Sequence, residues 1–158
     1  MKYYIIAGEA SGDLYGSNLV KELKLKDPKA TIRAWGGDLM QEQGVELVKH
    51  YKDHNYMGFL EVIRNLGTIL KNIAFCKKDI KEFNPDALIL IDFPGFNMRI
   101  AKYFYKYSFP VLYYIAPQVW AWKENRVESI EKYVDRLYVI LPFEKDFLKK
   151  HGVDSNYM

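Results

Sequence analysis

An uninterrupted apolar run in the middle of the chain limits the available folds more than any other feature. Residues 87–91 (ALILI) are followed at once by Asp92, Phe93 and a Pro-Gly pair. A short run without polar alternation is typical of a strand buried on both faces, as in a parallel sheet covered by helices. In open α/β sheets, ligands bind at the carboxyl ends of the strands. Asp92 is therefore predicted to lie where a ligand would bind.

Strand-like and helix-like segments alternate along the whole chain. This alternation predicts an α/β fold, a Rossmann-like, doubly wound parallel sheet with helices on both faces. Strands are expected at 3–7, 31–35, 45–48, 87–91, 111–115 and 136–140, with the lead-in to another at 153–158. Helices are expected at 14–26, 39–43, 57–84, 98–107, 124–133 and 141–151, and a loop at 50–56.

The composition excludes several classes of site. With 158 residues, 49% of them hydrophobic, the chain is large enough for one domain with a full core. A formal net charge of +3 is too small to indicate nucleic-acid binding. Cys76 is the single cysteine, which excludes an internal disulfide and zinc sites built on four cysteines or on two cysteines and two histidines. The histidines lack metal-ligand spacing, and no apolar run approaches the ~20 residues that span a bilayer.

The first candidate ligand loop follows the first strand, at residues 8–13 (GEASGD). Gly8 and Gly12 would let a ligand approach the backbone, and the amino end of the following helix favours anions or polar sugar groups. Ser11 and Asp13 are suited to cap that helix. The loop matches neither Gly-x-Gly-x-x-Gly nor a phosphate-binding P-loop. A tight turn with a helix cap is the alternative interpretation, and the loop alone does not decide between them.

The second candidate loop is 92–97 (DFPGFN). Desolvation beside Phe93 and Phe96 would raise the pKa of the Asp92 carboxyl, which suits a general base. Asn97 can orient a hydroxyl through its amide. The alternative is that Asp92 caps a helix beginning near Met98. Its position at a strand end favours the functional interpretation.

The third candidate loop is 116–122 (APQVWAW). Its candidates for substrate contact are Gln118 and Trp120. The indole rings of Trp120 and Trp122 could present flat apolar faces to a sugar ring or an acyl chain. They could equally pack beneath the edge of the sheet, since aromatic residues are often buried.

The segment from Met57 to Ile73 has the periodicity of an amphipathic helix, with residues 59, 62, 63, 66, 69, 70 and 73 on one face. That face packs against the core by default. Alternatively, it docks on an anionic membrane surface beside Lys71, Lys77, Lys78 and Lys81. Periodicity alone does not distinguish packing against the core from docking on a membrane. The membrane-docking candidates are Met57, Phe59, Leu60 and Ile63.

Five segments in order carry a resemblance to a known family. They are 7–13 (AGEASGD), 57–62 (MGFLEV), 91–97 (IDFPGFN), 114–122 (YIAPQVWAW) and 141–144 (LPFE). The set closely resembles the amino-terminal half of the bacterial lipid A disaccharide synthases, which are glycosyltransferases of the GT-B fold. Members are about twice this length. We therefore expect residues 1–158 to be the amino-terminal, acceptor-binding domain, with the carboxyl-terminal UDP-sugar domain outside this chain.

The resemblance implies an inverting transfer in lipid A biosynthesis. The substrates would be UDP-2,3-diacylglucosamine and 2,3-diacylglucosamine 1-phosphate, and the products UDP and the β-1,6-linked disaccharide 1-phosphate. It implies no cofactor and no essential metal. It also implies a cytoplasmic protein held peripherally at the inner face of the inner membrane, and it is compatible with a homodimer of the full-length protein.

The resemblance assigns roles to residues of the first two loops. Asp92 matches the essential acid of the family and would deprotonate the 6-hydroxyl of the acceptor. Glu9, Ser11 and Asp13 would shape the adjacent pocket, and Asn97 would hold Asp92 or a sugar hydroxyl. Gly95 stands where other members can carry an acid, so no second catalytic acid is assigned there.

Two other function classes remain open at this point. A dinucleotide-binding oxidoreductase domain is one, although Gly8, Gly12 and Gly16 have the wrong spacing and Asp38 is a poor match for the ribose-binding acid. A non-catalytic carbohydrate- or lipid-binding module is the other.

Overall fold

Seven parallel strands form one sheet in the computed structural model, which describes residues 1–54, 66–116 and 125–157. The strand order is β3-β2-β1-β4-β5-β6-β7, and each neighbouring pair is parallel. This confirms the predicted Rossmann-like, doubly wound sheet, whose winding direction reverses between β1 and β4. The strands are β1 Lys2–Ala7, β2 Thr31–Gly36, β3 Glu46–His50, β4 Ala87–Ile91, β5 Val111–Tyr114, β6 Arg136–Val139 and β7 Asn156–Tyr157.

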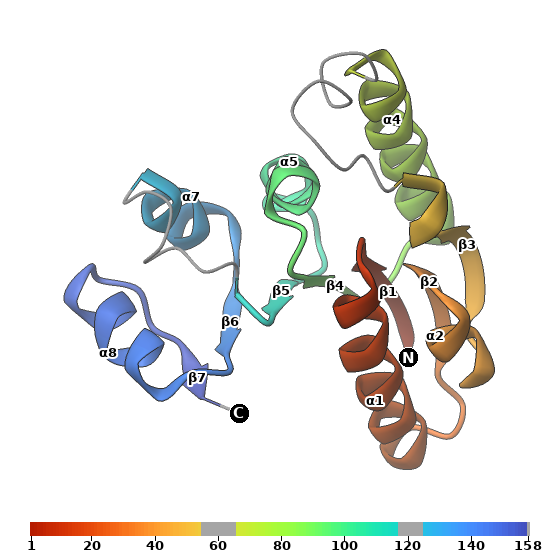
Figure 1. The fold of residues 1–158 in the computed structure, drawn as a ribbon, viewed down its shortest axis with the longest axis horizontal. Helices are drawn as coiled ribbons and strands as arrows, with labels where there is room; N and C mark the ends of the chain where they lie inside the picture. Colours follow the sequence, from red (N-terminus) through yellow and green to blue (C-terminus); the bar gives the residue numbers. More distant parts are fainter. Residues whose placement is uncertain (55–65, 117–124, 158) are drawn as a thin grey trace.

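Helices cover both faces of the sheet (Figure 1). Those after β1 and β2 pack on one face, and those after β3 to β6 pack on the other, as two separate apolar clusters show. None of the described helices combines the length and apolar character that crossing a bilayer requires. The helices are α1 Ala10–Lys26, α2 Asp38–Glu42, the 3-10 helix η1 Tyr51–His54, α4 Leu66–Phe83, α5 Pro94–Phe104, α7 Asn125–Tyr133 and α8 Pro142–Lys150.

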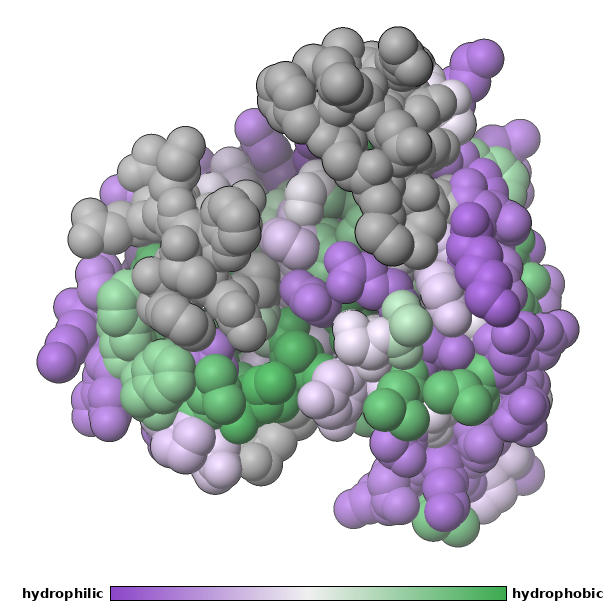
Figure 2. Space-filling view, viewed as in Figure 1, coloured by the Kyte–Doolittle hydropathy of each residue, from purple (hydrophilic) through white to green (hydrophobic). Residues whose placement is uncertain are grey.

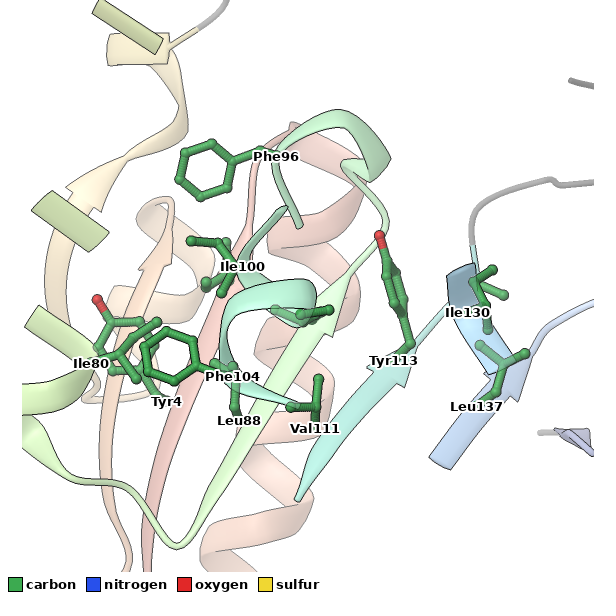
Figure 3. Packing of buried hydrophobic residues seen from close by; sticks show 14 of the residues in the cluster. Tyr4, Ile80, Leu88, Phe96, Ile100, Phe104, Val111, Tyr113, Ile130 and Leu137 are labelled. Atoms are coloured by element: carbon green, nitrogen blue, oxygen red, sulfur yellow. The ribbon is translucent and has the colours of Figure 1, made fainter. Parts of the chain in front are cut away.

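The central strand β4 is buried along its whole length, as its sequence predicts. Leu88 and Leu90 pack on the side of α4 and α5, while Ile89 and Ile91 pack on the side of α1. Figure 3 shows Leu88 within the first of these clusters, close to side chains from α5. Burial on both faces fixes β4 at the centre of the molecule, so the residue that follows it is held firmly in place.

The face of the sheet that carries α1 and α2 is covered unevenly. Between them α1 and α2 cover β1 to β4, and Leu112, Tyr114 and Ile140 on the remaining part of this face are only partly buried. Figure 2 shows hydrophobic side chains gathered over β5, β6 and α8.

Two elements differ from the prediction. The helix α5 begins at Pro94 rather than near Met98, because Pro94 occupies the first helical position, where a missing N–H costs nothing. Residues 51–54 form η1 where a loop was expected.

The apolar face of α4 is buried only in part: Ile73 is buried, as packing against the core requires. The buried residues of α4 also include Asn72 and Cys76, whereas Leu66 and Leu70 are 50% and 52% exposed. Asn72 tolerates burial because its Oδ1 accepts a hydrogen bond from the Lys49 ammonium at 2.6 Å. The apolar residues of this segment therefore do not all pack in the core: Leu66 and Leu70 lie at the surface.

A buried polar network joins α4 to the sheet. The Asp79 carboxylate accepts the Tyr4 hydroxyl at 2.6 Å and pairs with the Arg33 guanidinium at 2.9 Å. Trp35 Nε1 donates to the Tyr4 oxygen at 3.0 Å. Burial is the main cause that raises the pKa of Tyr4 above its ordinary value, so Tyr4 stays a neutral donor. The network fixes the position of α4 against β1 and β2.

Asp79→Ala is expected to destabilise the domain by about 3 kcal/mol, because it leaves the Arg33 charge and the Tyr4 hydroxyl without their shared partner. Urea denaturation measures the change. Glu82→Ala on the same helix removes only an exposed pair with Lys78 at 3.7 Å. It is expected to change the free energy of unfolding by less than about 0.5 kcal/mol. Equal effects of the two substitutions would contradict the role of the network.

Candidate active site

The site lies at the carboxyl edge of the sheet, between β1 and β4. Ala7 and Ile91, the last residues of these strands, are paired in register. Gly8 and Asp92 therefore emerge side by side, and from there the chain turns to α1 on one face and α5 on the other. At such a reversal point the loops diverge and leave a crevice, which is where open α/β sheets bind ligands.

The backbone at this edge is strained. Asp92, Phe93 and Ile115 have φ values of 43°, 50° and 66°, in the left-handed region that non-glycine residues avoid. The Asp92 N–H donates to the Ile115 carbonyl at 3.2 Å, so the strained residues after β4 and β5 are joined. Each costs about 1–3 kcal/mol and persists only where the surroundings enforce it, as they do at functional sites.

The Asp92 carboxyl group is half-buried. Burial raises its pKa above the ordinary aspartate value, and the Phe93 N–H, which favours the charged form, opposes that shift in part. The N-cap position of α5 belongs to Phe93, so the interpretation of Asp92 as the cap of a later helix is wrong. The carboxyl is thus a partly desolvated group at a strand end.

Glu9 is the second acid at this edge. It occupies the N-cap position of α1, and its side chain is exposed. Partial desolvation at the edge of the sheet is the larger cause that raises the pKa of Glu9, and the negative charge of Asp92 is the smaller one. Two carboxyl groups within electrostatic reach can bind hydroxyl groups. Among residues 1–54, 66–116 and 125–157, no cluster of three or more His, Cys, Asp or Glu side chains could hold a metal ion.

Asn97 supports the site from inside the protein. Its side chain is completely buried, and Nδ2 donates to the carbonyl oxygens of Asp92 at 2.8 Å and Ile91 at 3.2 Å. A more distant contact of 3.4 Å reaches the carbonyl of Ile6 on β1. Asn97 therefore holds the Asp92 backbone and ties β1 to β4. Of its two predicted roles, holding Asp92 fits this geometry, and reaching a sugar hydroxyl does not.

Asp13 serves a different helix from the one predicted. Glu9 is the N-cap of α1, so Ser11 and Asp13 lie inside the helix, and the prediction that they cap it is wrong. Asp13 is buried and accepts the backbone N–H groups of Gly37, Leu39 and Met40 at 2.8 to 3.1 Å, which caps α2. Both of its carboxylate oxygens are occupied by these N–H groups, so Asp13 supports α2 rather than a substrate.

Gly8 is required by a close contact rather than by an unusual dihedral angle. The Phe93 ring lies over it, and a Cβ atom at Gly8 would be 2.3 Å from Phe93 Cγ. The ring stacks in turn on Phe96, with centroids 5.2 Å apart. Phe93 thus occupies the space above Gly8 through which a dinucleotide diphosphate would approach, which weighs against a dinucleotide-binding domain.

Of the remaining predicted site residues, the structure describes Ser11 and Gly12. Ser11 is exposed in the first turn of α1, and Gly12 is buried against Ala7. Gln118, Trp120 and the membrane-docking candidates Met57, Phe59, Leu60 and Ile63 lie outside the described residues.

Tyr113 belongs to the site, although the sequence does not single it out. Its hydroxyl donates to the Asp92 carbonyl oxygen at 2.6 Å. The available signal was its position on the expected strand 111–115, from which an inward-facing tyrosine needs a partner for its hydroxyl.

Solved structures define the fold class of the domain. The chain is similar to a UDP-GlcNAc 2-epimerase from Neisseria meningitidis bound to UDP-GlcNAc, with 12% identity and a TM-score of 0.66 over 97% of this chain and 43% of that one. It is also similar to a putative UDP-N-acetylglucosamine 2-epimerase from Listeria monocytogenes, with 14% identity and a TM-score of 0.67 over 97% and 42%. At these identities the likeness shows the fold alone. The chain is a Rossmann-like domain of the kind found in GT-B proteins.

Sequence comparison gives the particular family. The family model described as lipid-A-disaccharide synthetase matches residues 3–158. Relatives named lipid-A-disaccharide synthase are 47% identical in Geobacter metallireducens, 40% in Myxococcus xanthus and 38% in Coxiella burnetii, each over 98% of this chain. The chain belongs to the lipid-A-disaccharide synthetase family. It spans about two fifths of the length of these relatives, 40 to 41%.

Gly8→Ala is expected to destabilise the domain by about 1–3 kcal/mol, because the new methyl group would displace the Phe93 ring and the turn that carries it. Thermal or urea denaturation measures this loss. Gly95→Ala is the matched control, since a Cβ there meets no described atom within 4 Å. Gly95 lies in the first turn of α5, so its substitution should be neutral or slightly stabilising. A Gly8→Ala protein as stable as wild type would contradict the described packing.

Proposed function

We propose that this chain is the amino-terminal, acceptor-binding domain of an inverting glycosyltransferase. The full-length protein would transfer 2,3-diacylglucosamine from UDP-2,3-diacylglucosamine to 2,3-diacylglucosamine 1-phosphate, as in lipid A biosynthesis. The observation that carries the proposal is a half-buried Asp92 at the reversal point of the sheet, in a chain of the lipid-A-disaccharide synthetase family. The domain that binds most of the UDP would lie outside residues 1–158.

Asp92 is the general base in this proposal. Its ionised carboxylate takes the proton of the acceptor 6-hydroxyl as that oxygen bonds to the anomeric carbon of the donor. The bond from that carbon to the UDP oxygen breaks, and UDP leaves with the electron pair. A pKa raised by burial brings the base closer to the working pH and makes it a stronger proton acceptor. A single base on the face opposite the leaving group gives inversion.

Glu9 and Ser11 supply polar groups beside that base. Both are exposed at the start of α1, next to the crevice. A carboxylate accepts hydrogen bonds from sugar hydroxyls, and a serine hydroxyl can donate or accept. Burial and the negative charge of Asp92 both raise the pKa of Glu9 above its ordinary value. These residues would orient the acceptor rather than transfer its proton.

Asp92→Asn in the full-length protein is expected to lower kcat for UDP release by at least about 100-fold, because the amide keeps the shape and cannot accept the proton. Asp86→Asn is the control. Asp86 lies at the opposite end of β4, where its carboxylate accepts the Lys2 N–H at 2.7 Å. Turnover of Asp92→Asn within a few-fold of wild type would remove Asp92 as the base. A wild-type protein that binds the diacylated sugars and releases no UDP would instead be a binding module.

We also propose that α4 and α5 help to hold the protein at an anionic membrane surface. The predicted docking residues at 57–63 precede α4. Leu66 and Leu70, each about half exposed, follow on one side of that helix. Beside them, a pocket of about 390 Å³ between the two helices is lined by Leu70, Ile73, Lys77, Arg99, Lys102 and Tyr103. Apolar side chains next to exposed cations are the pattern that binds acidic lipid headgroups.

A triple substitution of Lys77, Arg99 and Lys102 by Glu is expected to abolish sedimentation of the full-length protein with vesicles of 30% phosphatidylglycerol. Each basic residue near an acidic surface contributes about 1 kcal/mol, so reversing three charges exceeds a hundredfold in affinity. The control reverses three exposed lysines on the α1 side, Lys21, Lys26 and Lys29. Equal losses in both triple variants would show dependence on net charge alone and contradict this surface.

A further inference from the structure

The backbone of Asp92 is held by side chains from two other elements. Its carbonyl oxygen accepts one hydrogen bond from the Tyr113 hydroxyl on β5, at 2.6 Å, and one from Asn97 Nδ2 on α5, at 2.8 Å. Its N–H donates to the carbonyl of Ile115, just after β5, at 3.2 Å. The N–H and the carbonyl of Asp92 are therefore both held. Tyr113 and Ile115 lie outside the 92–97 loop, and Asn97 is its last residue.

The two side-chain donors are removed from solvent. Tyr113 and Asn97 are each 0% exposed, so neither can touch a substrate. Figure 3 shows Tyr113 projecting from β5 with its hydroxyl pointing to the segment between β4 and α5. Hydrogen bonds in such a low-dielectric interior are strong, and a buried donor that loses its acceptor is costly. Any contribution of these side chains to a reaction is therefore indirect, and the Asp92 carbonyl oxygen is the group of the site that both of them contact.

The conformation they hold would not persist unaided. Asp92 and Phe93 are consecutive left-handed residues, and Phe93 has a bulky side chain that disfavours this region. The Cα that carries the Asp92 carboxyl belongs to the same strained turn. Relaxation of the turn toward ordinary dihedral angles would rotate that Cα and move the carboxyl group away from its place beside Glu9.

We propose that Tyr113 is a positioning residue for the transfer reaction. Together with Asn97, it holds the left-handed turn at Asp92 so that the carboxylate faces the crevice in the geometry that proton transfer needs. This inference rests on the proposed function and extends it to a residue of β5 to which the sequence resemblance assigns no role. A displacement of about 1 Å at a catalytic group can cost about 100-fold in rate.

The test is Tyr113→Phe in the full-length protein, which removes the hydroxyl and keeps the ring. The expected result is a kcat for UDP release about 10- to 100-fold lower, with KM for both sugars within about threefold of wild type. Tyr138→Phe is the matched control, because it removes a hydroxyl from a tyrosine on the next strand, away from the Asp92 turn. Its kcat should stay within twofold of wild type.

The pH profile separates positioning from a general loss of structure. A looser turn would admit water to the Asp92 carboxyl and weaken the desolvation that raises its pKa. The acid limb of kcat/KM should then move to lower pH in Tyr113→Phe. Glu9, at the start of α1, is the charged side chain whose field couples to Asp92, and it is unchanged in this variant. A purely structural role would reduce the active fraction at every pH and leave the limb in place.

Asp92→Asn, measured in the same assay, distinguishes failure of the positioning role from failure of the proposed function. The positioning role is overturned if kcat of Tyr113→Phe stays within twofold of wild type, or if kcat falls while the acid limb does not move. In either case an inactive Asp92→Asn still supports the proposed function. An active Asp92→Asn overturns both. Should Tyr113→Phe fail to fold, Asn97→Leu removes the other donor with a side chain of similar shape, and the same expectations and contradictions apply to it.

Discussion

The parallel pairing of β1 with β4 is the constraint on which the site depends. The register that places Ala7 opposite Ile91 makes Gly8 and Asp92 neighbours, although 83 positions of the chain separate them. The side chains of β4 pack into apolar clusters on both faces of the sheet, so a shift of register would repack both clusters, and the position of Asp92 is fixed by the core. The reversal of winding at this pair of strands then opens the crevice above them.

The rest of the site uses that rigid base to hold an unfavourable turn. Asp92 and Phe93 adopt left-handed dihedral angles, the Phe93 ring rests on Gly8, and two buried donors fasten the Asp92 carbonyl. Each contact compensates part of the cost of the turn, and none of them uses the Asp92 carboxylate. The carboxylate contacts the Phe93 N–H within its own loop and still faces the crevice, while its backbone is held in place. This is the arrangement expected of a preorganised catalytic group.

The sequence predicts the fold well because each signal for it is local. Uninterrupted apolar runs such as 87–91 identify strands, and the periodicity between them identifies helices, so the sheet and its parallel winding follow. The sequence places the start of α5 near Met98 instead of Pro94, because a Pro-Gly pair is as typical of a turn as Pro is of the first helical position. Asp92 could be singled out for the same local reason, since it directly follows a buried strand.

The contacts within the site could not be predicted from the sequence, because they depend on pairs far apart in the chain. Asp13 caps α2 through backbone amides some 25 positions away, and no spacing rule at 8–13 reveals this. Tyr113 reaches Asp92 only after β5 has paired with β4. On α4, periodicity identified the apolar residues and left undecided whether Leu66 and Leu70 face the core or the surface.

The central claim is that Asp92 takes a proton from a sugar alcohol. A crystal structure of the full-length protein with 2,3-diacylglucosamine 1-phosphate bound would test it most directly. The account predicts an Asp92 carboxylate oxygen about 2.6–3.2 Å from the acceptor 6-hydroxyl, directly or through one water. An acceptor whose 6-hydroxyl contacts another ionisable side chain, with Asp92 beyond that reach, would contradict it.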